Sequence, residues 1–85
     1  MAYYRVEFKR SVKKDLKQLP KSDVVGILNK IEALTENPRP PQSKKLIGLD
    51  LYRLKVGRYR ILYEIKDQIL IITIIKIAHR KDVYH

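Results

Sequence analysis

The stretch LYRLKVGRYRILYEI, from Leu51 to Ile65, has the pattern of a β-hairpin. Apolar or aromatic residues alternate with polar ones on both sides of Gly57, as in strands with one buried face. Gly57 and Arg58 fit a two-residue type II′ turn, because glycine tolerates the positive φ of the first turn position. In that register the apolar face carries the opposed pairs Val56 with Tyr59, Leu54 with Ile61, and Tyr52 with Tyr63.

The same register gathers cations on the other face of the hairpin. Lys55 lies directly opposite Arg60, and Arg53 lies opposite Leu62. Like charges that face each other across two strands destabilise a hairpin by a few tenths of a kcal/mol up to about 1 kcal/mol. We therefore expect an anionic partner to offset this repulsion.

Length and composition narrow the class of protein. The chain has 85 residues, which predicts one domain over residues 1–85 with a modest core. Its net charge of +10 favours a polyanionic partner, which could be nucleic acid, an acidic protein or a membrane surface. We see no signal peptide and no apolar run near the roughly 18 residues of a membrane span, so we expect a cytoplasmic protein without a membrane partner. The absence of cysteine excludes thiolate catalysis and Cys-ligated zinc.

The residues before the hairpin predict a strand and then a helix. Residues 3–8 alternate like a strand with one buried face. Ser11 is a candidate N-cap for a short basic helix that ends before Pro20. The apolar residues of this helix lie at helical spacing: Val12, Leu16 and Leu19.

A second helix is expected from about Ser22 to Asn37. Gly26 inside it suggests close packing against the sheet or the first helix, because glycine otherwise costs about 1 kcal/mol of helix propensity. Residues 37–45 are rich in proline and predict an extended connector without regular structure. The expected buried stripe of the helix consists of Val24, Leu28, Ile31 and Leu34, with Val25 and Ile27 beside it.

After the hairpin, Lys66 to Gln68 predict a turn, and residues 69–78 are apolar on both faces, as in a covered central strand. A three-residue loop would place Lys76 on the cationic face, whereas a two-residue loop would place it under Tyr59. The cost of burying a lysine favours the first. The predicted fold class is α+β: an N-terminal strand, a two-helix hairpin, then an antiparallel three-stranded meander, with the helices on one face.

Common catalytic motifs are missing. The carboxylates form no metal-binding grouping, and there is neither a glycine-rich phosphate loop nor a Ser/His/Asp set, so no metal or cofactor is expected. Arginine binds two phosphate oxygens at once, a lysine held among cations has its pKa lowered toward use as a base, and tyrosine can stack on a nucleobase. Metal-free RNA cleavage needs such roles, although the cations could equally form a solvated face. The candidates are Arg53, Lys55 and Arg60 on the sheet, with His79, Arg80 and Tyr84 on a tail that could fold over it.

Two parts of the sequence resemble a known family. LYRLKVGRYRILYEI followed by IAHRKDVY resembles the RelE family of bacterial and archaeal toxins in the RelE/ParE superfamily, and YYRVEFKRSVKKDLKQLP resembles its N-terminal strand and helix. The resemblance implies a RelE-like fold and a toxin that enters the ribosomal A site, cuts messenger RNA there and leaves a 2′,3′-cyclic phosphate. It also implies a RelB-like antitoxin, with operator DNA bound only through the toxin–antitoxin complex.

The resemblance also implies roles for individual residues. Lys55 matches the lysine proposed as general base, and Arg60 matches the arginine proposed to stabilise the transition state. Arg53 stands where the family often has a second lysine; since arginine cannot act as a base at ordinary pH, Lys55 is the better candidate. Arg80 matches the tail arginine credited with leaving-group or phosphate assistance, and Tyr84 matches the tyrosine that stacks on the messenger base.

Other functions stay open on the sequence alone. A ParE-like toxin that poisons DNA gyrase without nuclease activity is the alternative on the same fold, and a non-toxic nucleic-acid-binding module is a third. The cationic set favours the ribonuclease, since a gyrase poison has no evident need for it. His79 could supplement the acid–base chemistry, although the family does not require it.

Overall fold

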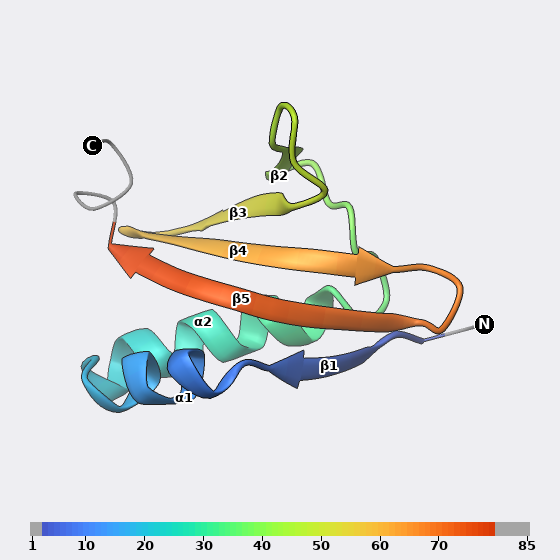
Figure 1. Cartoon of the computed structure of the whole chain (residues 1–85). Coiled ribbons are helices and arrows are strands. Elements are labelled where there is room, and N and C mark those ends of the chain that lie inside the picture. Colours follow the sequence, from blue (N-terminus) through green and yellow to red (C-terminus); the bar gives the residue numbers. More distant parts are fainter. Residues whose placement is uncertain (1–2, 80–85) are drawn as a thin grey trace.

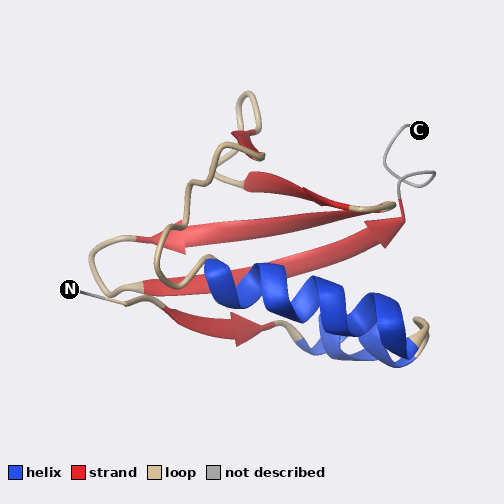
Figure 2. Ribbon diagram, turned by 180° about the vertical axis from the view of Figure 1, so that it is seen from behind, coloured by secondary structure: helices blue, strands red, loops and turns tan. Residues whose placement is uncertain are grey.

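The computed structural model describes residues 3–79, which form a five-stranded sheet with two helices on one side (Figures 1 and 2). The strand order is β1-β5-β4-β3-β2, in which β1 runs parallel to β5 and the other neighbours are antiparallel. The predicted α+β class and the antiparallel meander β3-β4-β5 are confirmed. The elements are β1 (Arg5–Phe8), α1 (Arg10–Lys17), α2 (Lys21–Ala33), β2 (Ser43–Lys45), β3 (Tyr52–Val56), β4 (Tyr59–Lys66) and β5 (Ile71–His79).

The β3–β4 hairpin has the predicted register. Val56 faces Tyr59, and Lys55 faces Arg60. Gly57 has a φ of +57°, whereas Arg58 does not have a positive φ, as a type II′ turn requires. The apolar face of the hairpin points toward the helices, and Tyr63 on that face is fully buried.

A β-bulge sets the face to which Lys76 belongs. The turn from β4 to β5 has four residues, Asp67 to Leu70, so the predicted three-residue loop is wrong. The register that starts at this turn, if continued without interruption, would place Lys76 opposite Ile61 on the buried face. Instead, the bulge between Leu62 and Tyr63 shifts the pairing by one residue, and Lys76 faces Leu62. Lys76 is therefore exposed on the face away from the helices, as predicted, for a different reason.

The residues that cover the sheet agree in part with the predicted stripe: Ile31 and Leu34 are buried as predicted, whereas Ile27 is buried in place of Leu28. Ile27 and Ile31 of α2 and Leu34, directly after it, are at most 2% exposed, whereas Leu28 is 39% exposed and Val25 is 59% exposed. The sequence fits both stripes, because each has helical spacing. Contact with the sheet selects the one centred on Ile27. Val12 is the fully buried residue of α1.

Three local predictions on the helices are wrong. Ser11 lies inside α1, which begins at Arg10 after an extended Lys9 whose side chain makes no capping hydrogen bond. The second helix ends at Ala33 and does not reach Asn37 as predicted, although a turn continues to residue 36. A Cβ built on Gly26 would meet no atom within 4 Å, so this glycine is not required by close packing. None of the helices within residues 3–79 is long and apolar enough to cross a membrane.

The connector of residues 37–45 is not irregular throughout. Its last three residues form β2, in which Ser43 faces Leu54 and Lys44 faces Arg53. The prolines end at Pro41, so the following residues have the backbone N–H groups that proline lacks, and this segment can pair with the open edge of β3. The sheet therefore gains an edge strand that carries lysine.

Candidate functional site

The sheet face away from the helices, which we name the open face, consists of rows of side chains that the strand register defines. Two rows lie nearest the β3–β4 turn, and each of them contains two or more cations. The first row contains Lys55, Arg60 and Ala78, and the second contains Lys44, Arg53, Leu62 and Lys76. We name Lys44, Arg53, Lys55, Arg60 and Lys76 the cationic end of the open face.

Lys55 and Arg60 form the pair that the sequence predicts. They are directly opposite in the antiparallel ladder, which places their Cβ atoms roughly 4.5 to 5.5 Å apart. Lys55 is exposed, whereas Arg60 is only 6% exposed, and its Nη1 lies 3.4 Å from the carbonyl oxygen of Tyr59. An exposed amino group therefore lies beside a largely buried guanidinium group.

Arg53 extends this pair into the second row. It is half-buried and lies between Lys44 on β2 and Leu62 on β4. Lys44 was missed by sequence reasoning, because residues 37–45 were expected to have no regular structure. The signal that could have revealed it is the proline-free SKK run, which matches the open edge of β3 in length and polarity.

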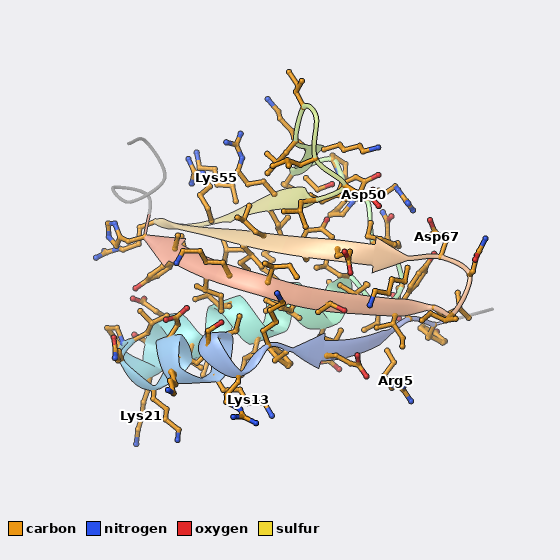
Figure 3. All side chains as sticks on the ribbon, in the orientation of Figure 1. Arg5, Lys13, Lys21, Asp50, Lys55 and Asp67 are labelled. Carbon is orange, nitrogen blue, oxygen red and sulfur yellow. The ribbon has the colours of Figure 1, made fainter. Side chains whose placement is uncertain are left out.

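The exposed and half-buried cations of this end lack acidic partners among the described residues. Within residues 3–79, none of Lys44, Arg53, Lys55 and Lys76 forms an ion pair. The next rows along the same face contain Glu7 with Glu64 and then Arg5 with Lys66. There the charges are paired: Arg5 Nη2 lies 3.7 Å from Glu7 Oε2, and Lys66 Nζ lies 3.5 Å from Glu64 Oε1. Along the open face, the cations without an ion pair among the described residues therefore lie near the hairpin turn, at the end of the sheet where Figure 3 labels Lys55.

The residues predicted on the tail do not all join this site. His79 is the last residue of β5 and lies opposite Tyr59, whose ring it meets edge-on at 5.6 Å between centroids. Because Tyr59 faces the helices, His79 lies on the other side of the sheet from Lys55, within β5 and not on a tail that folds over the cationic face. Arg80 and Tyr84 lie outside the described residues.

Tyr59 is itself fixed by α2. Its hydroxyl group donates a hydrogen bond of 2.7 Å to Asp23 Oδ2. This bond, together with desolvation and the negative charge of Asp23, raises the pKa of Tyr59 above its ordinary value. The contact ties the tip of the hairpin to the start of α2 and so holds the backbone that carries Arg60.

A polar cluster at the opposite end of the sheet was also missed by sequence reasoning. Arg39 of the connector forms two hydrogen bonds with Asp67, of 3.3 Å to Oδ1 and 2.8 Å to Oδ2, and its Nε donates to the Tyr52 hydroxyl at 3.0 Å. The Tyr4 hydroxyl donates to Asp67 Oδ1 at 2.6 Å. The Arg39 and Tyr4 hydrogen bonds lower the pKa of Asp67, and the bond to Asp67 raises the pKa of Tyr4. This cluster joins the connector to the β4–β5 turn. No local sequence motif predicts it, because its residues are far apart in the chain.

The described residues offer no group of three or more His, Cys, Asp or Glu side chains that could hold a metal ion. The chemistry that the cationic end itself offers is the binding of phosphate groups. Cations that are mostly exposed on a sheet face suit an extended polyanion better than a small enclosed ligand.

A family model described as the ParE toxin of the type II toxin–antitoxin system parDE matches residues 6–84. Among curated proteins, the chain is 38% identical over 85 residues to RelE1 of Methanocaldococcus jannaschii, which covers 95% of this chain and 94% of that protein.

Two solved complexes have the same fold. One is the archaeal RelE-RelB complex from Pyrococcus horikoshii OT3, with a TM-score of 0.84 and 33% identity over 92% of this chain and 96% of that chain. The other is the toxin–antitoxin complex RelBE2 from Mycobacterium tuberculosis, with a TM-score of 0.82 and 26% identity over 92% of this chain and 99% of that chain.

Proposed function

Because the chain belongs to the RelE/ParE superfamily of type II toxin–antitoxin toxins, as a RelE-like toxin, we propose that it is a ribosome-dependent, metal-independent endoribonuclease. It cuts messenger RNA in the ribosomal A site and thereby inhibits translation. The observation that carries this proposal is the direct opposition of Lys55 and Arg60 on the open face. These two residues match the family positions for the general base and the transition-state arginine.

The proposed reaction uses the 2′-hydroxyl group of the message as nucleophile. Lys55 takes its proton while the 2′-oxygen attacks phosphorus and the bond from phosphorus to the 5′-oxygen breaks. Arg60 stabilises the extra negative charge of the phosphorane, and Arg53 binds the neighbouring phosphate. By the resemblance, Arg80 assists the leaving 5′-oxygen, which takes up a proton from water, and Tyr84 stacks on the base. The products are a 2′,3′-cyclic phosphate and a 5′-hydroxyl end.

The ribosome has a physical role in this scheme. Lys55 is exposed on a sheet face, so we expect the ribosome to fix the 2′-hydroxyl group in line for attack. Correct orientation of two reacting groups can contribute on the order of 10⁵ M or more in effective molarity. We therefore expect programmed ribosomes to be good substrates and naked RNA to be a poor one.

The decisive experiment uses ribosomes programmed with a message whose A-site codon carries single 2′-deoxy substitutions. Primer extension should map one cut in the unmodified message, and end analysis should find a cyclic phosphate. Removing the 2′-hydroxyl group at the cut should abolish cleavage, while the same substitution one codon away should not. Cleavage that survives the first substitution, or equal rates on naked RNA, would contradict the proposal.

The alternative is a ParE-like gyrase poison. It remains a candidate because the matching family model is described as the ParE toxin. A DNA gyrase supercoiling assay with the same preparation separates the two. Inhibition of supercoiling by a protein that leaves messages intact would favour the alternative.

We also propose a RelB-like antitoxin as partner, since both solved complexes contain toxin together with antitoxin. The net charge of +10 favours an acidic partner, which could lay a helix in a groove or add a strand to a sheet edge. A small protein encoded beside this chain should co-purify with it and relieve its toxicity, and salt should weaken the complex. Failure of both co-purification and relief would contradict this partner.

A further inference from the structure

A line of side chains crosses the open face at right angles to the strands, one row away from Lys55 and Arg60. In this row Lys44 of β2 faces Arg53 of β3, Arg53 faces Leu62 of β4, and Leu62 faces Lys76 of β5. Adjacent strands lie about 4.8 Å apart, so the row spans roughly 14 Å from Lys44 to Lys76. It lies two residues, or roughly 7 Å, from the row of Lys55 and Arg60.

The bulge beside Leu62 is what completes this row. Without it, the register of the β4–β5 turn would direct Lys76 to the helix-covered face. Bulges often redirect a side chain at a functional site, and they disrupt the ladder locally. Here the local irregularity places a third cation in line with Lys44 and Arg53.

The row also has the exposure and charge of a binding surface. Lys44 and Lys76 are exposed, Arg53 and Leu62 are half-buried, and none of the three cations has an ion pair within residues 3–79. Lys44 and Arg53 are like charges in direct opposition, an arrangement that destabilises the sheet unless an anion bridges them. Leu62 at the centre offers an apolar contact for a ribose or a base.

We propose that Lys44, Arg53 and Lys76 hold consecutive phosphates of single-stranded RNA beside the bond that is cut. Lys44 and Lys76 are then positioning residues, which fix the path of the message over Lys55 and Arg60 and do not take part in the chemistry. The inference rests on the proposed function for the identity of the polyanion. It adds β2 and β5 to the RNA-binding surface.

The test measures binding without cleavage. A fluorescent oligouridylate is titrated with wild-type protein and with the double variant Lys44→Gln, Lys76→Gln at several salt concentrations. Each lost phosphate contact reduces the slope of log affinity against log salt by about 0.7 for single strands, so the double variant should lose about 1.4. If the affinities of the two proteins become equal near 1 M salt, the double variant should bind about 25-fold more weakly at 0.1 M salt.

The control is the double variant Lys45→Gln, Lys13→Gln. It removes the same charge, but Lys45 faces Tyr52 on the other side of β2 and Lys13 lies on α1. Its salt slope should stay within error of wild type, and both double variants should keep the wild-type melting curve or exceed it. An equal loss in both variants, an unchanged slope in the first, or no measurable binding by wild type would overturn the inference.

Two further outcomes distinguish this inference from its premises. If wild type does not cut ribosome-bound message but the slope still falls in the first variant, the RNA row holds and only the proposed ribonuclease fails. If the first variant loses affinity for the antitoxin but not for RNA, the row is a site for an acidic protein, and the inference is wrong.

Discussion

The two ends of the sheet differ in whether their charged side chains form ion pairs. At the end near the β4–β5 turn, Arg39 Nη2 lies 2.8 Å from Asp67 Oδ2 and Lys66 lies 3.5 Å from Glu64. At the cationic end, Lys55 faces Arg60 across the hairpin, with no acidic partner for Lys55 within residues 3–79. Figure 3 shows Asp67 and Lys55 at these opposite ends.

This contrast separates charges that serve the fold from charges that serve a partner. A chain optimised only for stability would place acids beside both sets, since opposed like charges weaken strand pairing. Proteins commonly accept such a loss where binding or catalysis needs it. We name the end near the β4–β5 turn, with its Arg39–Asp67 and Lys66–Glu64 ion pairs, the paired end. We therefore expect mutations at the cationic end to change activity and mutations at the paired end to change stability.

The largest expected effect comes from Lys55→Ala. Loss of a positioned general base typically lowers the rate by about 10² to 10⁴, so single-turnover cleavage on programmed ribosomes should fall at least about a hundredfold. Lys55 is exposed, so thermal melting should be unchanged or slightly higher.

Lys66→Ala is the matched control for this prediction, because Lys66 is also an exposed lysine of the open face, but at the paired end. Its cleavage rate should stay within about twofold of wild type, since exposed ion pairs contribute little. Full activity of a folded Lys55→Ala variant would remove Lys55 as the base. Equal losses in both variants would break the contrast between the two ends.

The cationic pair could be predicted because a short local rule determines it. Gly57 selects the turn, the turn sets the register, and the register forces Lys55 opposite Arg60. Lys76 was placed on the correct face by its burial cost alone. The bulge that actually places it depends on pairing over the whole length of β5, which local pattern does not encode.

The features that were missed depend on contacts between distant parts of the chain. Arg39 and Asp67 are 28 residues apart, and their pairing exists only because the connector passes the β4–β5 turn. The orientation of α2 was ambiguous for a similar reason, since Ile27 and Leu28 each fit a helical stripe and only the sheet decides between them. His79 falls on the helix side because the bulge shifts the register of β5.

A smaller effect, in stability, is expected from Asp67→Asn at the paired end. The Arg39 and Tyr4 hydrogen bonds lower the pKa of Asp67 in the folded chain, so ionised Asp67 stabilises the fold. This contribution is complete above the ordinary value of 3.8 and is lost as pH falls through the lower folded value. The variant should melt below wild type at pH 7, and the two melting temperatures should converge as pH falls through the lower pKa of folded Asp67.

Cleavage by Asp67→Asn, measured below its melting temperature, should stay close to wild type, because Asp67 lies far along the sheet from Lys55. A difference in melting temperature that persists unchanged at low pH would show that the carboxylate charge is not the source of the stabilisation.

The smallest expected effect is a gain in stability from Lys44→Gln. The substitution removes one of two like charges that face each other across β2 and β3, where such opposition costs a few tenths of a kcal/mol up to about 1 kcal/mol. Urea unfolding should therefore shift to slightly higher denaturant, and the gain should shrink as added salt screens the wild-type repulsion. Lys45→Gln gives the matched comparison, since it removes the same charge from the neighbouring residue, which faces Tyr52 instead of Arg53. If Lys45→Gln stabilises the chain as much as Lys44→Gln does, the gain comes from net charge alone. Repulsion between Lys44 and Arg53 would then be too weak to support the argument that this end of the sheet binds an anion.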